Sequence, residues 1–307
     1  MGYADRHDAI FTDDKRYIYR GTWLQLMRPL TLSGTITPTL VGTGLAMKTG
    51  FFSWYPFVLF LISAMLIQMT VNMFNDYFDF LHGQDEDKWQ EVDSNDSRHG
   101  VSLHMIPVVA VMFILLASTL GYFLALASTM WIIPVGIVSI FAGIKYSAGK
   151  HAFASIAMGE VIAFLFLGVV VTVLAYVVQT NIMTAEIVIA GVFFGLLIAS
   201  MILTNNIRDI EKDKPFRKTL AILLGRKRAI QLLKTGIVLL YVSVIFVTLS
   251  GLLSMKVLLV MLALPMGMKL LRSFQKKVNV EKEAQVMKWA ALHHMAFGLL
   301  FALAVWL

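Results

Sequence analysis

Long apolar stretches, separated by short polar ones, follow one another along the chain from residue 23 to its end. A membrane-spanning helix needs about 20 mainly apolar residues. Nine stretches approach or exceed this length, at residues 23–47, 52–80, 105–127, 131–146, 154–178, 185–207, 229–249, 255–271 and 285–307, and the fourth and eighth are short. None alternates apolar and polar residues with period two, which excludes a β-barrel. The pattern predicts an all-α integral membrane protein with about nine transmembrane helices.

Residues 1–22 are polar and lack the apolar core of a signal peptide. We therefore expect two parts: a polar N-terminal segment (1–22) and a single transmembrane domain (23–307).

Composition supports the membrane interpretation. Hydrophobic residues make up 58% of the chain and charged residues only 15%, whereas soluble domains are about one quarter charged. The absence of cysteine excludes a disulfide framework, a thiolate metal site and a cysteine nucleophile. The net charge of +7 fits polar loops held against an anionic membrane surface, so we expect the lipid bilayer and not nucleic acid as the partner of the basic residues.

The basic residues predict the orientation in the membrane. With nine crossings, every Lys and Arg except Lys48 and Lys256 falls on the side that carries the N-terminus. Basic loops face the cytoplasm. We therefore expect a multi-pass protein of the cell membrane, with the N-terminus and the loops near 81–104, 145–153, 208–228 and 272–284 in the cytoplasm and the C-terminus outside.

The second apolar stretch ends in VNMFNDYFDF (residues 71–80), where an amide and two carboxylates interrupt a membrane segment. An ionisable group inside a bilayer costs at least about 2.5 kcal/mol and by default marks a functional site. Asn75 and Asp79 are four residues apart and share one helix face, and Asp76 and Asp85 complete the cluster.

A second cluster, TNNIRDIEKDK (residues 204–214), repeats this arrangement on the same side of the membrane. Asp209 and Asp213 are four residues apart, with Asn205 or Asn206 one turn earlier. Oxygen ligands without His or Cys suit Mg²⁺, which proteins hold by one or two carboxylates while substrate phosphates complete its coordination. Arg217 and Lys218 follow and could neutralise the oxygens of a leaving group. These clusters favour a diphosphate–Mg²⁺ site. A cation-coupled transporter and a non-catalytic membrane scaffold remain the alternatives.

Four segments together resemble one family. The pattern N-D-x-x-D-x-x-x-G-x-D, at Asn75 to Asp85, resembles the first aspartate-rich motif of the UbiA superfamily of intramembrane prenyltransferases. NNIRDIEKDK followed by RKTLAILLG resembles the second motif of its quinone-forming branch, and RPLTLSGTITPTLVGTGLA and SRHGVS resemble two further elements of that branch. The similarity extends from about residue 23 to the end of the chain.

The resemblance implies a helical bundle around a central cavity, with both motifs in cytoplasmic cap loops. It implies that the enzyme uses Mg²⁺ to transfer a polyprenyl group from its diphosphate to 1,4-dihydroxy-2-naphthoate, with loss of CO₂ and diphosphate, in menaquinone biosynthesis. Other acceptors, 4-hydroxybenzoate or haem, are the alternatives within the family. No obligate protein partner is expected.

The site residues follow from the resemblance and from the residue types. The expected metal-binding residues are Asn75, Asp79, Asp85, Asp209 and Asp213. The expected catalytic residues are Asp79, Asp209, Asp213 and Lys218. The expected residues for binding the diphosphate and the acceptor are Asn75, Arg208, Arg217, Lys145, Tyr146, Arg28 and Arg98, with Arg28 or Arg98 recognising the acceptor carboxylate and Tyr146 flanking the allylic cation. The segment KYSAGK (residues 145–150) departs from the family pattern, which bears on the identity of the acceptor.

Overall fold

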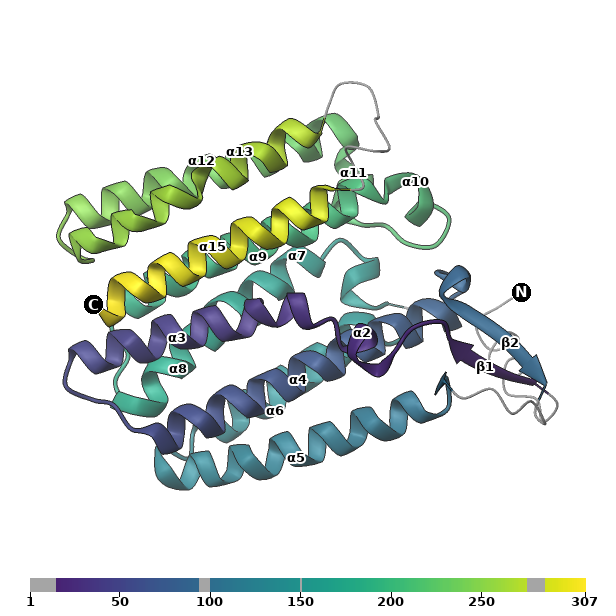
Figure 1. Cartoon of the computed structure of the whole chain (residues 1–307), viewed down its shortest axis with the longest axis horizontal. Coiled ribbons are helices and arrows are strands. Elements are labelled where there is room, and N and C mark those ends of the chain that lie inside the picture. Colours follow the sequence, from purple (N-terminus) through teal and green to yellow (C-terminus); the bar gives the residue numbers. More distant parts are fainter. Residues whose placement is uncertain (1–14, 94–99, 150, 275–284) are drawn as a thin grey trace.

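Helices that run side by side form most of the molecule (Figure 1). The computed structural model describes residues 15–93, 100–149, 151–274 and 285–307. The longer helical elements are α3 (Ser33–Lys48), α4 (Trp54–Leu81), α5 (Met105–Ala127), α6 (Ile132–Ser147), α7 (Gly159–Ala163), η4 (Phe164–Val170), α8 (Val171–Thr180), α9 (Ala185–Arg208), α12 (Arg226–Leu249), η5 (Met255–Ala263), α13 (Leu264–Ser273) and α15 (Val286–Trp306). Elements α7, η4 and α8 continue one another as a single rod, in which η4 is a π-helix.

Six helices of the described residues are long and apolar enough to cross a membrane: α4, α5, the α7–α8 rod, α9, α12 and α15. They confirm an integral membrane helical bundle. The elements α3, α6 and η5–α13 overlap three further predicted segments but are not among these six helices, so the count of nine crossings stays a prediction. The first strand and the end of α15 lie at opposite ends of the bundle, as an odd number of crossings requires (Figure 1).

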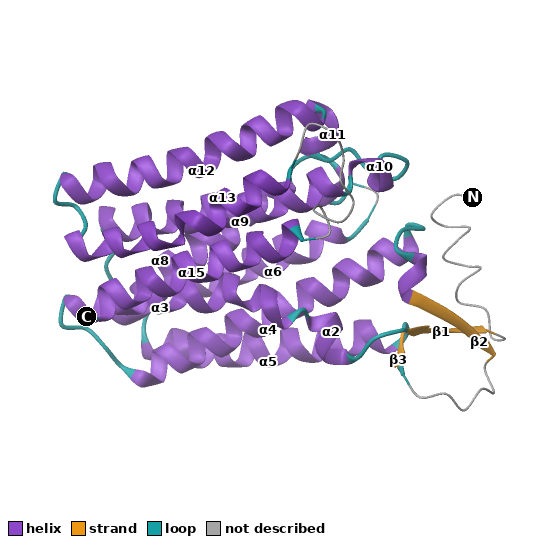
Figure 2. Cartoon of the chain, turned by 45° about the horizontal axis from the view of Figure 1, so that its top comes forward, coloured by secondary structure: helices purple, strands orange, loops and turns teal. Residues whose placement is uncertain are grey.

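A small antiparallel sheet at one end of the bundle adds to the predicted all-α fold (Figure 2). Its strands β1 (Lys15–Tyr19), β2 (Trp89–Asp93) and β3 (Val101–Ser102) lie in the order β2-β1-β3, with Tyr19 opposite Trp89. Residues of the predicted N-terminal segment therefore join the loop that follows the first motif. Strand β1 has the sequence KRYIY, rich in the aromatic and β-branched residues that favour strands. The ring of Tyr17 packs on Phe80 at the end of α4, with the ring centroids 5.1 Å apart.

The other short elements lie near the ends of the long helices. They are α2 (Trp23–Met27), η1 (Pro29–Leu32), η2 (Glu86–Lys88), η3 (Phe153–Ser155), α10 (Ile210–Asp213) and α11 (Leu220–Leu224). Elements α10 and α11 lie at the same end of the bundle as the sheet (Figure 2). The two aspartate-rich motifs therefore meet at this end.

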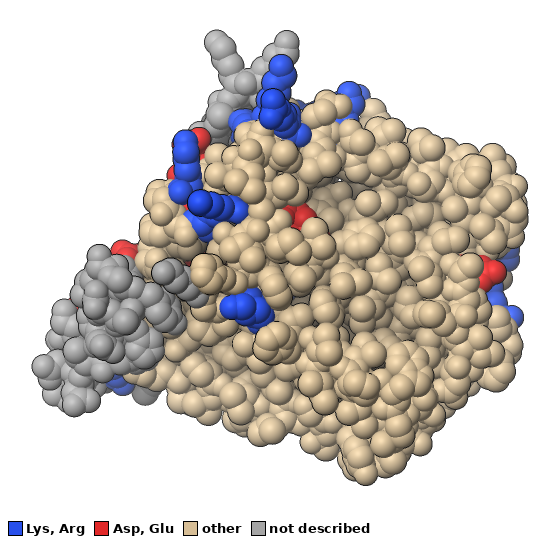
Figure 3. All heavy atoms as spheres, turned by 180° about the vertical axis from the view of Figure 1, so that it is seen from behind, with Lys and Arg blue, Asp and Glu red and all other residues tan. Residues whose placement is uncertain are grey.

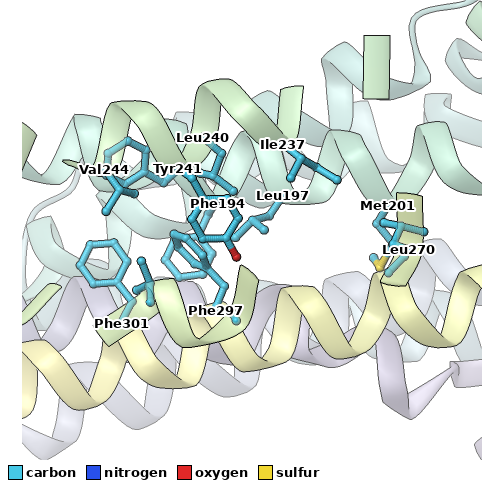
Figure 4. Close-up of a cluster of buried hydrophobic side chains, with 14 of the residues drawn as sticks. Phe194, Leu197, Met201, Ile237, Leu240, Tyr241, Val244, Leu270, Phe297 and Phe301 are labelled. Atoms are coloured by element: carbon cyan, nitrogen blue, oxygen red, sulfur yellow. The ribbon is translucent and has the colours of Figure 1, made fainter. Parts of the chain in front are cut away.

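The largest hydrophobic core fills the space between α9, α12, α13 and α15 (Figure 4). Phe194 of α9 stacks on Phe301 of α15 with an interplanar angle of 5°, and Phe297 meets both rings at steep angles. On another side of α9, the α7–α8 rod makes a backbone contact, since a Cβ atom on Gly168 would lie 2.2 Å from the Cα of Gly195. Such small residues let helices approach closely in membranes. The aromatic core and the close contact with the α7–α8 rod together fix the position of helix α9, which carries the second motif.

On the face shown in Figure 3, most charged side chains lie toward one end of the molecule and a few lie at the opposite end, and the surface between them is almost uncharged and hollowed near its centre. An uncharged band between charged ends is the surface expected of a protein surrounded by a bilayer.

Candidate active site

A cavity of about 740 Å³ lies between α4, α5, α6, the α7–α8 rod and α9. One end is charged and the other apolar. On α4 the lining runs from Asp79 to Phe60, a rise of about 28 Å at 1.5 Å per residue. The cavity therefore extends from the charged end of the bundle through most of the thickness of a bilayer, which is about 30 Å. Of the predicted site residues, those that line the cavity are Arg28, Asn75, Asp79, Asp85, Tyr146, Arg208, Asp209, Asp213 and Arg217.

The first motif ends α4 and is held by Arg28. Nη2 of Arg28 donates hydrogen bonds to Oδ1 of Asn75 and to Oδ1 of Asp76, both at 2.9 Å. Arg28 has a φ of 53°, a left-handed conformation that is uncommon for a residue other than glycine. The chain adopts it between α2 and Pro29, and the Arg28 side chain reaches the motif from there.

The second motif, where α9 ends, repeats this arrangement. The guanidinium of Arg208 forms two bonds with the Asp209 carboxylate, of 2.8 Å and 2.6 Å, and donates to Oδ1 of Asn205 at 2.9 Å. In each motif an arginine thus binds the oxygen of an asparagine amide together with a neighbouring carboxylate. Asp79 in the first motif and Asp213 in the second make no described hydrogen bond to these two arginines, and both line the cavity.

Arg217 connects the two motifs. Its Nη2 donates to Oδ1 of Asp213 at 2.9 Å, and its Nη1 lies 3.7 Å from Oδ1 of Asp79. Both carboxylates are buried. Burial raises the pKa of Asp213 despite the opposing effect of Arg217. Within the described residues the other oxygen of Asp213, Oδ2, has no hydrogen-bond partner. A buried carboxylate oxygen without a partner is costly, and a cation bound there would remove that cost.

Two lysines that the sequence interpretation did not include hold Asp85. Lys88 Nζ lies 2.7 Å from Oδ2 of Asp85, and Lys212 donates to its Oδ1. Burial acts to raise the pKa of Asp85, but the two lysines outweigh it and lower this pKa to about 2. Lys88 also binds Asp76, at 2.6 Å. The spacing of Lys88, three residues after Asp85, is the signal in the sequence that could have indicated this ion pair.

Lys145 and Lys218 are not among the residues that line the cavity, so the structure does not bring them to the predicted site. Lys145 precedes Tyr146 on α6, and neighbouring residues of a helix point about 100° apart, so the cavity-facing Tyr146 turns Lys145 away. Lys218 is exposed, and its backbone N–H donates to the carbonyl oxygen of Ser155 while the preceding Arg217 points inward. Arg98 lies outside the described residues.

The cavity also reaches the lipid-facing surface between α5 and α6. Tyr122 and Ile137 line the cavity although their exposed fractions are 52% and 63%. Both are similarly far from the loop that joins these helices, so they lie at a similar depth. Gly121 and Gly136 lie beside them in the lining, and a Cβ atom added at either would meet nothing within 4 Å. An apolar chain longer than the cavity would have an exit here.

The carboxylates are arranged to share a ligand, not to form a complete metal site by themselves. Among the described residues no three His, Cys, Asp or Glu side chains converge closely enough to hold a metal ion. Carboxylates from two motifs instead face one polar space next to Arg217. This arrangement suits a metal ion whose remaining ligands come from a bound anion, as is usual for Mg²⁺ with substrate phosphates.

The sequence of the chain is similar to those of proteins from one known family. The UbiA prenyltransferase family profile matches residues 35–295. The 1,4-dihydroxy-2-naphthoate octaprenyltransferase of Bacillus subtilis (strain 168) is 30% identical over 282 residues, which cover 92% of this chain and 91% of that protein. The 2-carboxy-1,4-naphthoquinone phytyltransferase of Synechocystis is 26% identical over 293 residues, or 92% of each chain.

A solved structure shares the fold. The UbiA homolog from Archaeoglobus fulgidus bound to DMAPP and Mg²⁺ has a TM-score of 0.63 to this chain and 16% sequence identity, covering 92% of this chain and 99% of that one. Similarity at this level of identity concerns the fold alone, and it confirms the predicted helical bundle.

Proposed function

Since the chain belongs to the UbiA prenyltransferase family, we propose that it transfers a polyprenyl group from an allylic polyprenyl diphosphate to 1,4-dihydroxy-2-naphthoate, releasing diphosphate and CO₂. The observation that carries the proposal is the bridge from Asp79 through Arg217 to Asp213 at the charged end of a long apolar cavity. The similarity to the Bacillus subtilis octaprenyltransferase supports the acceptor. The product is a menaquinone precursor.

Mg²⁺ fits the residues present. The polar end offers oxygen ligands from two motifs, and Asp213 Oδ2 is buried without a hydrogen-bond partner in the part of the chain that the structure describes. Asp79 and Asp213 would hold the ion together with the diphosphate. Asn75, Asp85 and Asp209 are bound by Arg28, by two lysines and by Arg208, respectively, and would have to exchange partners. When bound, Mg²⁺ supplies charge that stabilises the departing diphosphate.

The side chains of the protein bind the leaving diphosphate and shield the allylic cation from water. Arg217 donates hydrogen bonds to the diphosphate as the bond from its oxygen to the prenyl carbon breaks and both electrons leave with the diphosphate. The apolar cavity holds the prenyl chain and excludes water from the allylic cation. The ring carbon that bears the carboxylate then forms the new carbon–carbon bond, and CO₂ leaves in the place of a proton. This acceptor therefore requires no base for a ring proton, whereas 4-hydroxybenzoate requires one.

Arg28 is the residue that we propose to recognise the carboxylate of the acceptor. Both of its described hydrogen bonds, to Asn75 and Asp76, come from Nη2, and a guanidinium has five N–H donors. Arg28 lines the cavity, and its remaining donors suit a carboxylate. Tyr146, also in the cavity wall, would face the cation. The charged end of the bundle, with both motifs, faces the cytoplasm in this proposal, because it carries nearly all Lys and Arg residues.

Removal of divalent metal tests the proposal. Purified protein in lipid, given geranyl diphosphate, 1,4-dihydroxy-2-naphthoate and Mg²⁺, is expected to form prenylated, decarboxylated product, detected by mass spectrometry. EDTA should abolish this product and excess Mg²⁺ should restore it, whereas Ca²⁺ should not, because it prefers more ligands at longer distances. Diphosphate release without naphthoate product would instead favour another acceptor, 4-hydroxybenzoate or haem. Absence of any diphosphate binding would favour a cation-coupled transporter.

Gly121→Phe is expected to shorten the prenyl chain that the enzyme accepts. A phenyl ring would fill the open space at the exit between α5 and α6 and leave the charged end unchanged. Transfer of an octaprenyl group should fall by about 10-fold or more relative to transfer of a geranyl group. The ratio of kcat/KM for the two donors measures this effect. Leu116→Phe, an exposed position of α5 outside the cavity lining, should leave the ratio unchanged. An unchanged ratio for Gly121→Phe would place the exit elsewhere.

A further inference from the structure

Glu160 is a buried carboxylate whose position none of the motifs explains. It lies in the first turn of α7, inside the rod that is apolar enough to span the membrane, and only 6% of it is exposed. An acidic side chain in this setting is costly and usually has a function. Glu160 is not among the cavity-lining residues, so it is not placed to touch a substrate.

The partner of Glu160 belongs to the second motif. Oε1 of Glu160 accepts a hydrogen bond of 2.9 Å from Nδ2 of Asn206, three residues before Asp209. Asn206 is 9% exposed and lines the cavity. A carboxylate can only accept hydrogen bonds, so it must face the amide nitrogen of Asn206. The amide oxygen, Oδ1, is thereby turned away from Glu160.

Asn206 differs in this respect from the other two motif asparagines. The amide oxygens of Asn75 and Asn205 accept hydrogen bonds from Arg28 and Arg208. The structure gives Asn206 Oδ1 no such donor within the described residues, although Asn206 is in the cavity wall. An asparagine held through its nitrogen presents its oxygen to the cavity, where a hard cation would bind it.

We propose that Glu160 is a positioning residue that locks the Asn206 amide, so that Asn206 Oδ1 is a neutral oxygen ligand for the metal–diphosphate on the second-motif side. The inference rests on the proposed function. Glu160 lies outside both aspartate-rich motifs. In this proposal it acts as supporting carboxylates do in metal sites, where they hydrogen-bond a metal-binding side chain and fix its orientation. Loss of such a supporting partner typically lowers metal affinity by 10- to 100-fold.

The residues next to Glu160 are consistent with a fixed orientation of its side chain. Gly159 leaves room for the Tyr146 hydroxyl, which would lie 3.3 Å from a Cβ atom there. The second oxygen of Glu160, Oε2, has no hydrogen-bond partner among the described residues. The Asn206 amide is the side-chain partner of Glu160 among the described residues, so a substitution at either residue should first change the orientation of the other.

An exchange of the two functional groups tests the proposal. Glu160→Gln, Asn206→Asp and the double variant E160Q/N206D would be purified alongside the unmodified protein. Affinity for Mg²⁺ would be measured by titration calorimetry in the presence of geranyl S-thiolodiphosphate, an unreactive donor analogue, and without acceptor. Mn²⁺ binding followed by electron paramagnetic resonance gives a second readout that does not depend on turnover. Melting temperatures would be recorded on the same samples.

The E160Q variant should bind Mg²⁺ about 10-fold more weakly, because glutamine can face either end of the Asn206 amide and no longer fixes it. Its melting temperature should not fall, because the change removes a buried charge. N206D places two carboxylates together and should both bind more weakly and melt earlier. In the double variant the amide of residue 160 donates to the carboxylate of residue 206, whose other oxygen faces the cavity, so metal affinity should return to near that of the unmodified protein.

Three results would count against the inference. If E160Q binds Mg²⁺ as the unmodified protein does, Glu160 does not position a ligand. If the double variant binds no better than the single variants, the exchange has failed and the role of Glu160 is structural. If the unmodified protein itself shows no metal-dependent binding of the donor analogue, the proposed function fails together with the inference. Glu186→Gln, at a partly exposed position at the other end of the membrane segment, is the matched control and should change neither metal affinity nor melting temperature.

Discussion

Asp79→Asn is expected to lower the rate of prenyl transfer by about 100-fold or more, with little loss of folded protein. The substitution keeps the shape of the side chain and removes the charge that faces the Arg217 guanidinium across 3.7 Å. Without that charge the first motif contributes much less to holding a cation and the diphosphate. Arg217 keeps its hydrogen bond to Asp213, so the closed arrangement of the two motifs should persist.

Initial rates with geranyl diphosphate, 1,4-dihydroxy-2-naphthoate and Mg²⁺ measure the effect of Asp79→Asn, and the elution profile of the protein in detergent reports its folding. Glu211→Gln is the matched control, because Glu211 lies in the second motif but is exposed and outside the cavity lining. Its rate should stay close to that of the unmodified protein. Full activity of Asp79→Asn would overturn the role proposed for Asp79 in holding the cation and the diphosphate.

Arg217→Gln and Lys218→Gln should differ strongly although the two residues are adjacent. Arg217 is the described side chain that contacts carboxylates of both motifs, and its loss should lower kcat by about 100-fold because the leaving diphosphate loses its hydrogen-bond donor. Lys218 is exposed and does not line the cavity. The rate of the Lys218→Gln variant should therefore differ from that of the unmodified protein by less than about 2-fold, as expected for a surface charge.

Arg217→Lys separates the charge of Arg217 from its geometry. A lysine keeps the positive charge but cannot donate to two carboxylates in the fixed geometry of a guanidinium, so an intermediate rate is expected. The same rate assay measures all three variants. A loss of activity in Lys218→Gln as large as that in Arg217→Gln would support the role predicted for Lys218 from the sequence and contradict its placement in the structure.

Features that depend on residues close together in the chain follow from the sequence alone. The length of the apolar stretches predicts membrane helices, because the thickness of the bilayer sets the number of residues. The four-residue spacing of Asn75 and Asp79, and of Asp209 and Asp213, predicts their shared helix faces, because the pitch of a helix is fixed. The residue types favour an oxygen-ligand site, and the motifs identify the family, which the comparisons confirm.

Which of these residues face one another depends on the tertiary structure and could not be predicted from the sequence. The contact between Arg28 and Asp76 joins positions 48 residues apart, and no local rule relates them. The structure likewise separates Arg217 from Lys218, assigns Asp85 to two lysines and reveals the contact between Glu160 and Asn206. It also places part of the predicted polar N-terminal segment in a sheet. These outcomes depend on how separate helices and loops pack together, because packing fixes which side chains are buried and which charges can pair.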